Sequence, residues 1–149
     1  MFKVIALGSI LITVNVVIQA YGNIFWLKTI MPFFGINTFT AKHNLSVNST
    51  LKLLITSFLF FTVLHTVQTI IWASGFYFNP STTVDFSSFS ESLYFSIVTF
   101  TTLGYGDITL NSHWRLLSGL EAVNGIMLIG WSTAMMYSLI QNIYKRLKK

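Results

Sequence analysis

Three long stretches without a charged residue constrain the fold more than any other feature of this sequence. They cover residues 4–27, 53–76 and 122–144. Each is long enough to cross a bilayer core of roughly 30 Å as a helix, which takes about 20 apolar residues. Only 9% of all residues are charged, whereas soluble domains carry about 25%. The sequence therefore predicts an all-α membrane protein with three transmembrane helices.

A shorter apolar segment lies between the second and third stretches. Ser88-Phe89-Ser90-Glu91 has the S-x-x-E spacing of a capping box at a helix N-terminus, and the apolar run that follows ends at Phe100. A helix over residues 88–100 is too short to span a bilayer, so it suits a re-entrant helix buried in protein. Its C-terminus is the negative end of the helix dipole and favours a nearby cation.

The segment directly after this helix, residues 101–107, reads Thr-Thr-Leu-Gly-Tyr-Gly-Asp. Gly104 and Gly106 can take left-handed backbone conformations without a Cβ clash. A strand whose carbonyls all point to one side is then possible, and Thr102 adds a hydroxyl at its inner end. Four such strands around an axis make stacked rings of oxygens that can replace the water shell of a potassium ion.

Residues 102–107 resemble the selectivity filter of the potassium-channel family, usually written TVGYGD, with Leu103 in the valine position. The resemblance covers residues 51–149. It implies an outer helix over 51–76, a pore helix over 88–100, a filter over 101–107 and an inner helix over 114–144. The pattern around Gly125 and Gly130 is similar to a bacterial group of these channels that has an additional N-terminal helix.

That additional helix corresponds to residues 1–27 of this chain. A secretory signal peptide is the alternative, but the apolar run is long and lacks an A-x-A-like cleavage site. Residues 28–50 are expected to form a cytoplasmic linker, because Pro32, Gly35 and a polar run interrupt any spanning helix.

The resemblance implies how the filter binds its ion. Dehydrated K⁺ would be held by the Thr102 hydroxyl and by the backbone carbonyls of Thr102, Leu103, Gly104 and Tyr105, while Gly106 shapes the outer end. Because each chain supplies one filter strand, a closed ring needs four chains, so the expected partners are three identical subunits of a homotetramer in the lipid bilayer. K⁺ is the transported ion, and neither an organic cofactor nor nucleic acid is expected.

Four further residues are expected to support the filter, namely Thr101, Asp107, Tyr94 and Val98. Some family members carry a glutamate at the position of Val98, which pairs with the filter aspartate, and that carboxyl pair is absent here. Tyr94 stands where tryptophan is common, and its hydroxyl can donate to Asp107. The Tyr105 ring is expected to pack against the pore helix.

The inner helix is expected to contain the gate. Gly125 falls where related channels often carry a hinge glycine, and Gly130 offers a second flexible point. One stripe at helical spacing is expected to line the pore, and it consists of Ile126, Ile129, Thr133, Tyr137 and Ile140. Tyr137 or Ile140 would then close the narrow inner end by dewetting. The alternative is that both of these side chains face lipid.

Basic residues predict the orientation in the membrane. Only Lys3 and Arg115 fall on the filter side of the spans, whereas seven fall on the other side, namely Lys28, Lys42, Lys52, Lys145, Arg146, Lys148 and Lys149. Because loops rich in Lys and Arg stay in the cytoplasm, we expect the N-terminus outside and the C-terminus in the cytoplasm. The expected location is the cell membrane, specifically a bacterial inner membrane.

Two ionisable residues fall at membrane depth, where such residues are candidates for function. His65 lies in the second apolar stretch and Glu121 lies near the start of the last span. The alternatives are a neutral histidine bonded to a neighbouring helix and a carboxyl group hydrogen-bonded behind the filter. No span carries the regularly spaced arginines of a voltage sensor, so the sequence does not identify a gating stimulus.

Other functions agree less well with the sequence. A non-selective cation channel on the same scaffold is disfavoured by the complete Gly-Tyr-Gly-Asp run, and a non-conducting membrane subunit by a filter with no charged interruption. An enzyme is the weakest alternative, because the chain has no cysteine and no nucleophile and base at a sensible spacing.

Overall fold

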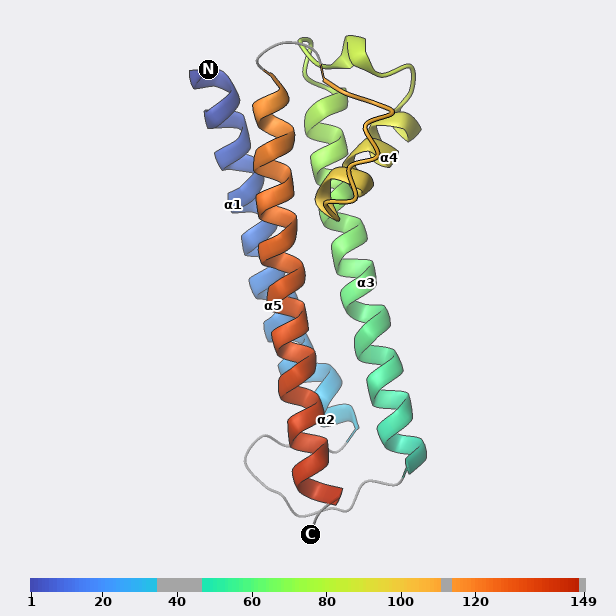
Figure 1. Cartoon of the computed structure of the whole chain (residues 1–149). Helices are drawn as coiled ribbons and strands as arrows, with labels where there is room; N and C mark the ends of the chain where they lie inside the picture. The colour runs from blue at the N-terminus through green and yellow to red at the C-terminus, as the bar shows by residue number, and fades with distance from the viewer. Residues whose placement is uncertain (35–46, 111–113, 148–149) are drawn as a thin grey trace.

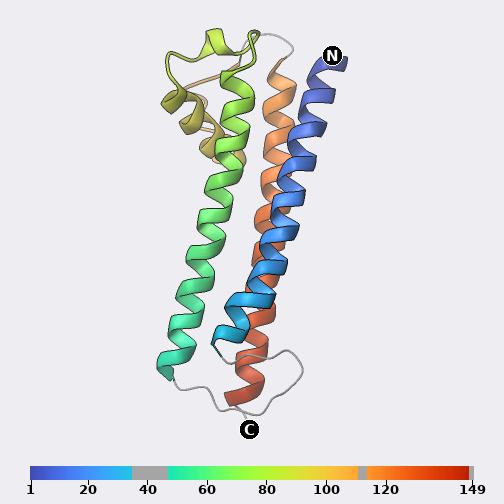
Figure 2. The same cartoon turned by 180° about the vertical axis from the view of Figure 1, so that it is seen from behind.

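Three long helices lie side by side in the computed structural model, which describes residues 1–34, 47–110 and 114–147 (Figure 1). They are α1 (Phe2–Phe25), α3 (Val47–Tyr77) and α5 (Arg115–Leu147). Each belongs to a helical stretch that is long and apolar enough to cross a membrane. Successive helices run in opposite directions, so the start of α1, the end of α3 and the start of α5 share one end of the bundle (Figure 2). The predicted three-span, all-helical fold is confirmed.

The first span extends further than predicted. A π-helical turn, Trp26–Ile30, follows α1, and α2 (Met31–Phe33) continues the helix. Pro32 does not break this helix, because proline is tolerated in the first turn of a helical segment. Here Pro32 follows a wider turn, in which the Met31 N–H donates a hydrogen bond to the Trp26 carbonyl. The expected end at residue 27 is therefore wrong, and so are the limits of the 28–50 linker. Residues 35–46 of that linker lie outside the described residues.

The other two spans also exceed their apolar cores. The outer helix begins at Val47 rather than at residue 51, and the inner helix continues to Leu147 rather than to residue 144. A polar or basic residue ends an apolar stretch of sequence, but the helix can continue through it. Lysine near a helix C-terminus also interacts favourably with the helix dipole. The sequence prediction therefore underestimated the length of both helices.

The short helix α4 (Phe89–Phe100) enters the bundle from the end that holds the N-terminus (Figure 1). Its bounds agree with the predicted 88–100, and Ser88 is the N-cap, accepting a hydrogen bond from the Glu91 N–H at 3.2 Å. The reciprocal bond differs from a standard capping box. The Glu91 carboxylate accepts from the Ser87 N–H at 2.6 Å, one residue earlier than the capping-box motif predicts.

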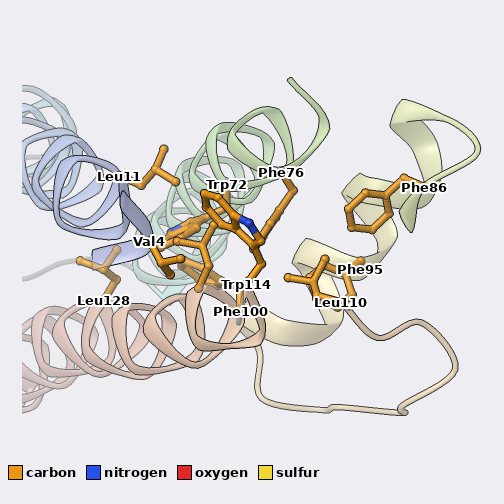
Figure 3. Close-up of a cluster of buried hydrophobic side chains, with 11 residues drawn as sticks. Val4, Leu11, Trp72, Phe76, Phe86, Phe95, Phe100, Leu110, Trp114 and Leu128 are labelled. Atoms are coloured by element: carbon orange, nitrogen blue, oxygen red, sulfur yellow. The ribbon is translucent and has the colours of Figure 1, made fainter. Parts of the chain in front are cut away.

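A cluster of buried aromatic and aliphatic side chains joins α4 to the three long helices (Figure 3). Phe95 of α4 packs edge-on against Phe76 of α3, with ring centroids 5.2 Å apart. The rest of the cluster comes from all three spans and from the segments around α4, and comprises Val4, Leu11, Trp72, Phe86, Phe100, Leu110, Trp114, Leu117 and Leu128. This packing fixes the depth and direction of α4, and therefore the start of the filter segment.

Small residues and a polar network attach α1 to the other spans. A Cβ added at Gly8 would lie 2.5 Å from Leu120 of α5, so the two helices approach closely there. Further along, Gln19 donates to Ser132 of α5 at 2.9 Å and accepts from Gln68 of α3 at 2.9 Å. Small interface residues and interhelical hydrogen bonds are the usual means of helix association in a bilayer. The first span is thus packed as an integral part of the bundle.

Candidate functional site

The filter segment, residues 101–107, leaves the inner end of α4 as extended, irregular backbone. Thr102, Gly104 and Gly106 have positive φ angles of 60°, 56° and 77°, so left-handed residues occur at every second position. The two glycines were expected to adopt this conformation, but Thr102 was not. A β-branched residue with positive φ is unusual and strained. The surrounding structure must therefore hold Thr102 in place.

Hydrogen bonds to the last turn of α4 hold the inner half of this segment. The N–H groups of Leu103 and Gly104 both donate to the Val98 carbonyl, at 2.9 and 3.2 Å, and the Thr102 N–H donates to the Thr99 carbonyl at 2.9 Å. By contrast, the carbonyls of residues 102–105 accept no hydrogen bond from the described part of the chain. The N–H groups are thus satisfied on one side, which leaves the carbonyl oxygens available to a ligand.

The filter segment lies entirely on the surface of the single chain. All seven of its residues are exposed, and the Tyr105 side chain is 67% exposed. The expected packing of the Tyr105 ring against the pore helix stays a prediction. A cavity of about 520 Å³ lies beside the segment, lined by Val98, Thr102 and Asp107 and by the first turns of α5.

The outer end of the segment is tied to α4 by the predicted hydrogen bond between Tyr94 and Asp107. The Tyr94 hydroxyl donates to Asp107 Oδ2 at 2.8 Å. This hydrogen bond is the main cause of a raised pKa of the Tyr94 hydroxyl, because losing the proton would remove the donor and place two negative groups together. Val98, at the position of the missing glutamate, is buried, and it contacts the filter segment through hydrogen bonds to its backbone carbonyl.

Comparison with known families agrees with this arrangement. Residues 53–142 match a family model described as "Ion channel". This chain is an ion channel of that family. Comparisons with curated proteins and with solved structures gave no match. The matched region includes most of α3, all of α4, the filter segment and most of α5, and the family is not one of enzymes.

Two serines anchor α4, the predicted pore helix, to α3, and sequence reasoning missed both. Ser92 Oγ donates to the Ala73 carbonyl and Ser96 Oγ to the Thr69 carbonyl, each at 2.9 Å. The serines and their acceptors are both four residues apart, so successive turns of α4 bond successive turns of α3. Two serines at i and i+4 within the buried face of a short helix were the available signal. Glu121 of α5 contacts Ser96 from the other side and is fully buried.

Gly125 has a packing role that the sequence did not reveal. A Cβ at this position would lie 2.0 Å from the backbone oxygen of Phe100, so α5 and the end of α4 touch there without a side chain between them. Gly130, by contrast, faces open space. The helix α5 runs without interruption through both glycines. The hinge role expected for Gly125 stays a prediction, while its close contact with the end of α4 is an observed feature.

The predicted pore-lining stripe lies mostly on an open face of α5. Ile126, Thr133, Tyr137 and Ile140 are exposed in the single chain and Ile129 is half-buried. The opposite face packs against α1 and α3 through side chains that include Leu128, Leu139 and Ile143. The stripe therefore remains available to a pore or to lipid, as the two alternatives require.

His65 lies near the inner end of α4, with its ring centroid 6.0 Å from that of Phe100. Its Nδ1 atom is 2.8 Å from Gln68 Oε1. Among the described residues, the hydrogen-bond partner of the ring therefore lies on its own helix and not on a neighbouring one. Gln68 in turn bonds Gln19. A chain of side-chain contacts therefore connects α1 with the vicinity of the filter. The other two histidines, His43 and His113, lie outside the described residues.

Proposed function

We propose that the channel conducts K⁺ selectively and passively, through a pore formed by four copies of this chain. The observation that carries the proposal is the backbone of the filter segment. Its inner N–H groups are bonded to the Val98 and Thr99 carbonyls, while the carbonyls of Thr102, Leu103, Gly104 and Tyr105 accept nothing from the described residues. Rows of such oxygens can substitute for the water around K⁺.

The exposure of the filter segment supports a tetramer. One strand presents a single row of carbonyls, and coordination on all sides of an ion needs a ring of them. An exposed Tyr105 ring and an open cavity beside the segment also leave apolar surface for a neighbouring subunit to cover. In this assembly the four filter segments face a common axis, and the stripe from Ile126 to Ile140 lines the path below them.

The positions of the charges support an orientation with the filter end outside the cell. Lys28, Lys52 and Lys145 belong to segments at the end of the bundle opposite the filter (Figure 1). With the positive end in the cytoplasm, the N-terminus lies outside the cell membrane. The chain has no cysteine, so a cysteine introduced at Ser81 should react with an impermeant thiol reagent added outside, and one at Lys52 should not. The reverse labelling pattern would contradict this orientation.

Ion flux in liposomes tests the function itself. Purified channel should pass K⁺ and exclude Na⁺, and the variant Tyr105→Ala should lose that preference or stop conducting, because the outer filter loses its bulky side chain. Equal passage of K⁺ and Na⁺ by the wild type would favour a non-selective cation channel. The absence of any flux would favour a non-conducting subunit, and unchanged selectivity in Tyr105→Ala would contradict the filter assignment.

A further inference from the structure

Glu121 is a carboxyl group buried within the membrane-spanning part of the molecule. Its side chain has no exposed surface. One oxygen, Oε1, contacts Ser96 Oγ of the pore helix, whereas Oε2 has no hydrogen-bond partner among the described residues. An ionised carboxylate at such a site would be largely desolvated, and one hydrogen bond is little compensation for that loss.

The hydrogen atoms around Ser96 decide which form of Glu121 fits. A serine hydroxyl has one hydrogen to donate. Ser96 Oγ lies 2.9 Å from the Thr69 carbonyl oxygen, which can only accept. One turn earlier, Ser92 makes the same bond to Ala73 at the same distance. With the Ser96 hydrogen directed to Thr69, the contact between Ser96 and Glu121 needs a hydrogen from Glu121.

We propose that Glu121 is a neutral carboxylic acid that donates a hydrogen bond to Ser96 and so positions the pore helix. The bonds then run in one direction, from the Glu121 hydroxyl to Ser96 Oγ and from Ser96 to the Thr69 carbonyl. They link α5, α4 and α3 in sequence. In the ionised alternative, Ser96 would turn its hydrogen toward Glu121 and place its own lone pairs against the Thr69 oxygen.

A second contact between α5 and α4 makes this role specific to the helix that carries the filter. Glu121 meets Ser96, and one turn further along both helices Gly125 meets the backbone of Phe100. These two contacts fix both the depth and the rotation of the last turn of α4. Val98, whose carbonyl holds the filter segment, lies between them in the sequence. Glu121 is therefore a positioning residue for the filter and does not itself touch the ion path.

Infrared spectroscopy can observe the protonation state directly. The chain contains two glutamates, Glu91 and Glu121. In the variant Glu91→Gln, grown with ¹³C-labelled glutamate, Glu121 carries the only labelled glutamate carboxyl group. We expect a labelled C=O band of a carboxylic acid at neutral pH and no labelled carboxylate bands. Labelled carboxylate bands without the acid band would overturn the proposal. The double variant Glu91→Gln, Glu121→Gln contains no glutamate and supplies the blank spectrum.

Three further variants test the bond to Ser96. Ser96→Ala in the labelled Glu91→Gln background should shift the acid band, because the O–H group loses its acceptor, and an unchanged band would contradict the bond. Glu121→Gln keeps a donor and an acceptor without a charge, so it should unfold at the wild-type temperature, whereas Glu121→Leu should unfold at a lower one. A Glu121→Gln variant as unstable as Glu121→Leu would contradict a neutral donor. None of these readouts depends on ion selectivity, so they fail or succeed separately from the proposed function.

Discussion

Replacing Gly125 by alanine distinguishes its two roles, because a hinge and a close packing contact predict different results. The added Cβ would lie 2.0 Å from the Phe100 backbone oxygen, and that separation must widen to at least 3.4 Å for ordinary contact. No change of rotamer can provide this space, since the obstructing atoms are backbone. The end of α4 and the start of the filter segment must therefore move away from α5.

The expected energy follows from two opposing effects. Overpacking of a tight site typically costs about 1–3 kcal/mol. Alanine in place of glycine within a helix returns about 0.5–1 kcal/mol. We therefore expect Gly125→Ala to lower the free energy of unfolding by about 1–2 kcal/mol, and also to reduce K⁺ flux because Thr101 and Thr102 are displaced.

Thermal unfolding in detergent, together with flux in liposomes, measures both effects. Gly130→Ala is the matched control, because a Cβ at Gly130 meets nothing within 4 Å. That variant should be as stable as the wild type or slightly more stable. The packing argument is refuted if Gly125→Ala is as stable as Gly130→Ala, and a change in open probability without lost stability would instead support the hinge.

Three further predictions concern the filter support, the gate and the pore-helix cap. Tyr94→Phe should destabilise the conducting filter, and its effect should not simply add to that of Asp107→Asn in a double-mutant cycle, since additive effects would mean the two side chains are uncoupled. Ile140→Asn should raise single-channel open probability by wetting the constriction. The control Met127→Asn, on another exposed part of α5, should not raise it. If the two variants have the same open probability, the gate lies elsewhere. Hydrogen bonds from Ser87 lower the pKa of Glu91. Its contribution to stability is therefore present above the unfolded pKa of about 4.3, and it is lost as pH falls through the folded pKa. Acid unfolding of the Glu91→Gln variant should lack this pH-dependent loss of stability.

The features that follow from local sequence were predicted well. Charge-free runs predicted the three spans because a bilayer imposes a minimum apolar length. Ser88 predicted the start of α4 because capping depends on neighbouring residues. The Tyr94 hydroxyl was assigned to Asp107 from the family resemblance and from the absence of a carboxyl at Val98, and the structure contains that bond.

Features that depend on contacts between distant segments were not predicted. The packing role of Gly125 depends on where the Phe100 oxygen lies, and nothing in the sequence near Gly125 records that position. Ser92 and Ser96 bond carbonyls of another helix, and a carbonyl has no sequence signature. The helix through Pro32 was missed because a proline usually ends a helix, whereas here a wider turn precedes it.

The tether between Val98 and the filter segment has a consequence for assembly. The N–H donors of Leu103 and Gly104 and the Val98 carbonyl that accepts from them belong to one chain. The inner filter is therefore ordered when the subunit folds, and its conformational entropy is lost before the subunit meets its neighbours. Association in the proposed tetramer then joins preorganised parts, which reduces the entropic cost of each contact between subunits. Variants that weaken the tether should therefore reduce the yield of assembled channel as well as its conduction, because subunits with a disordered filter would meet that cost at the moment of association.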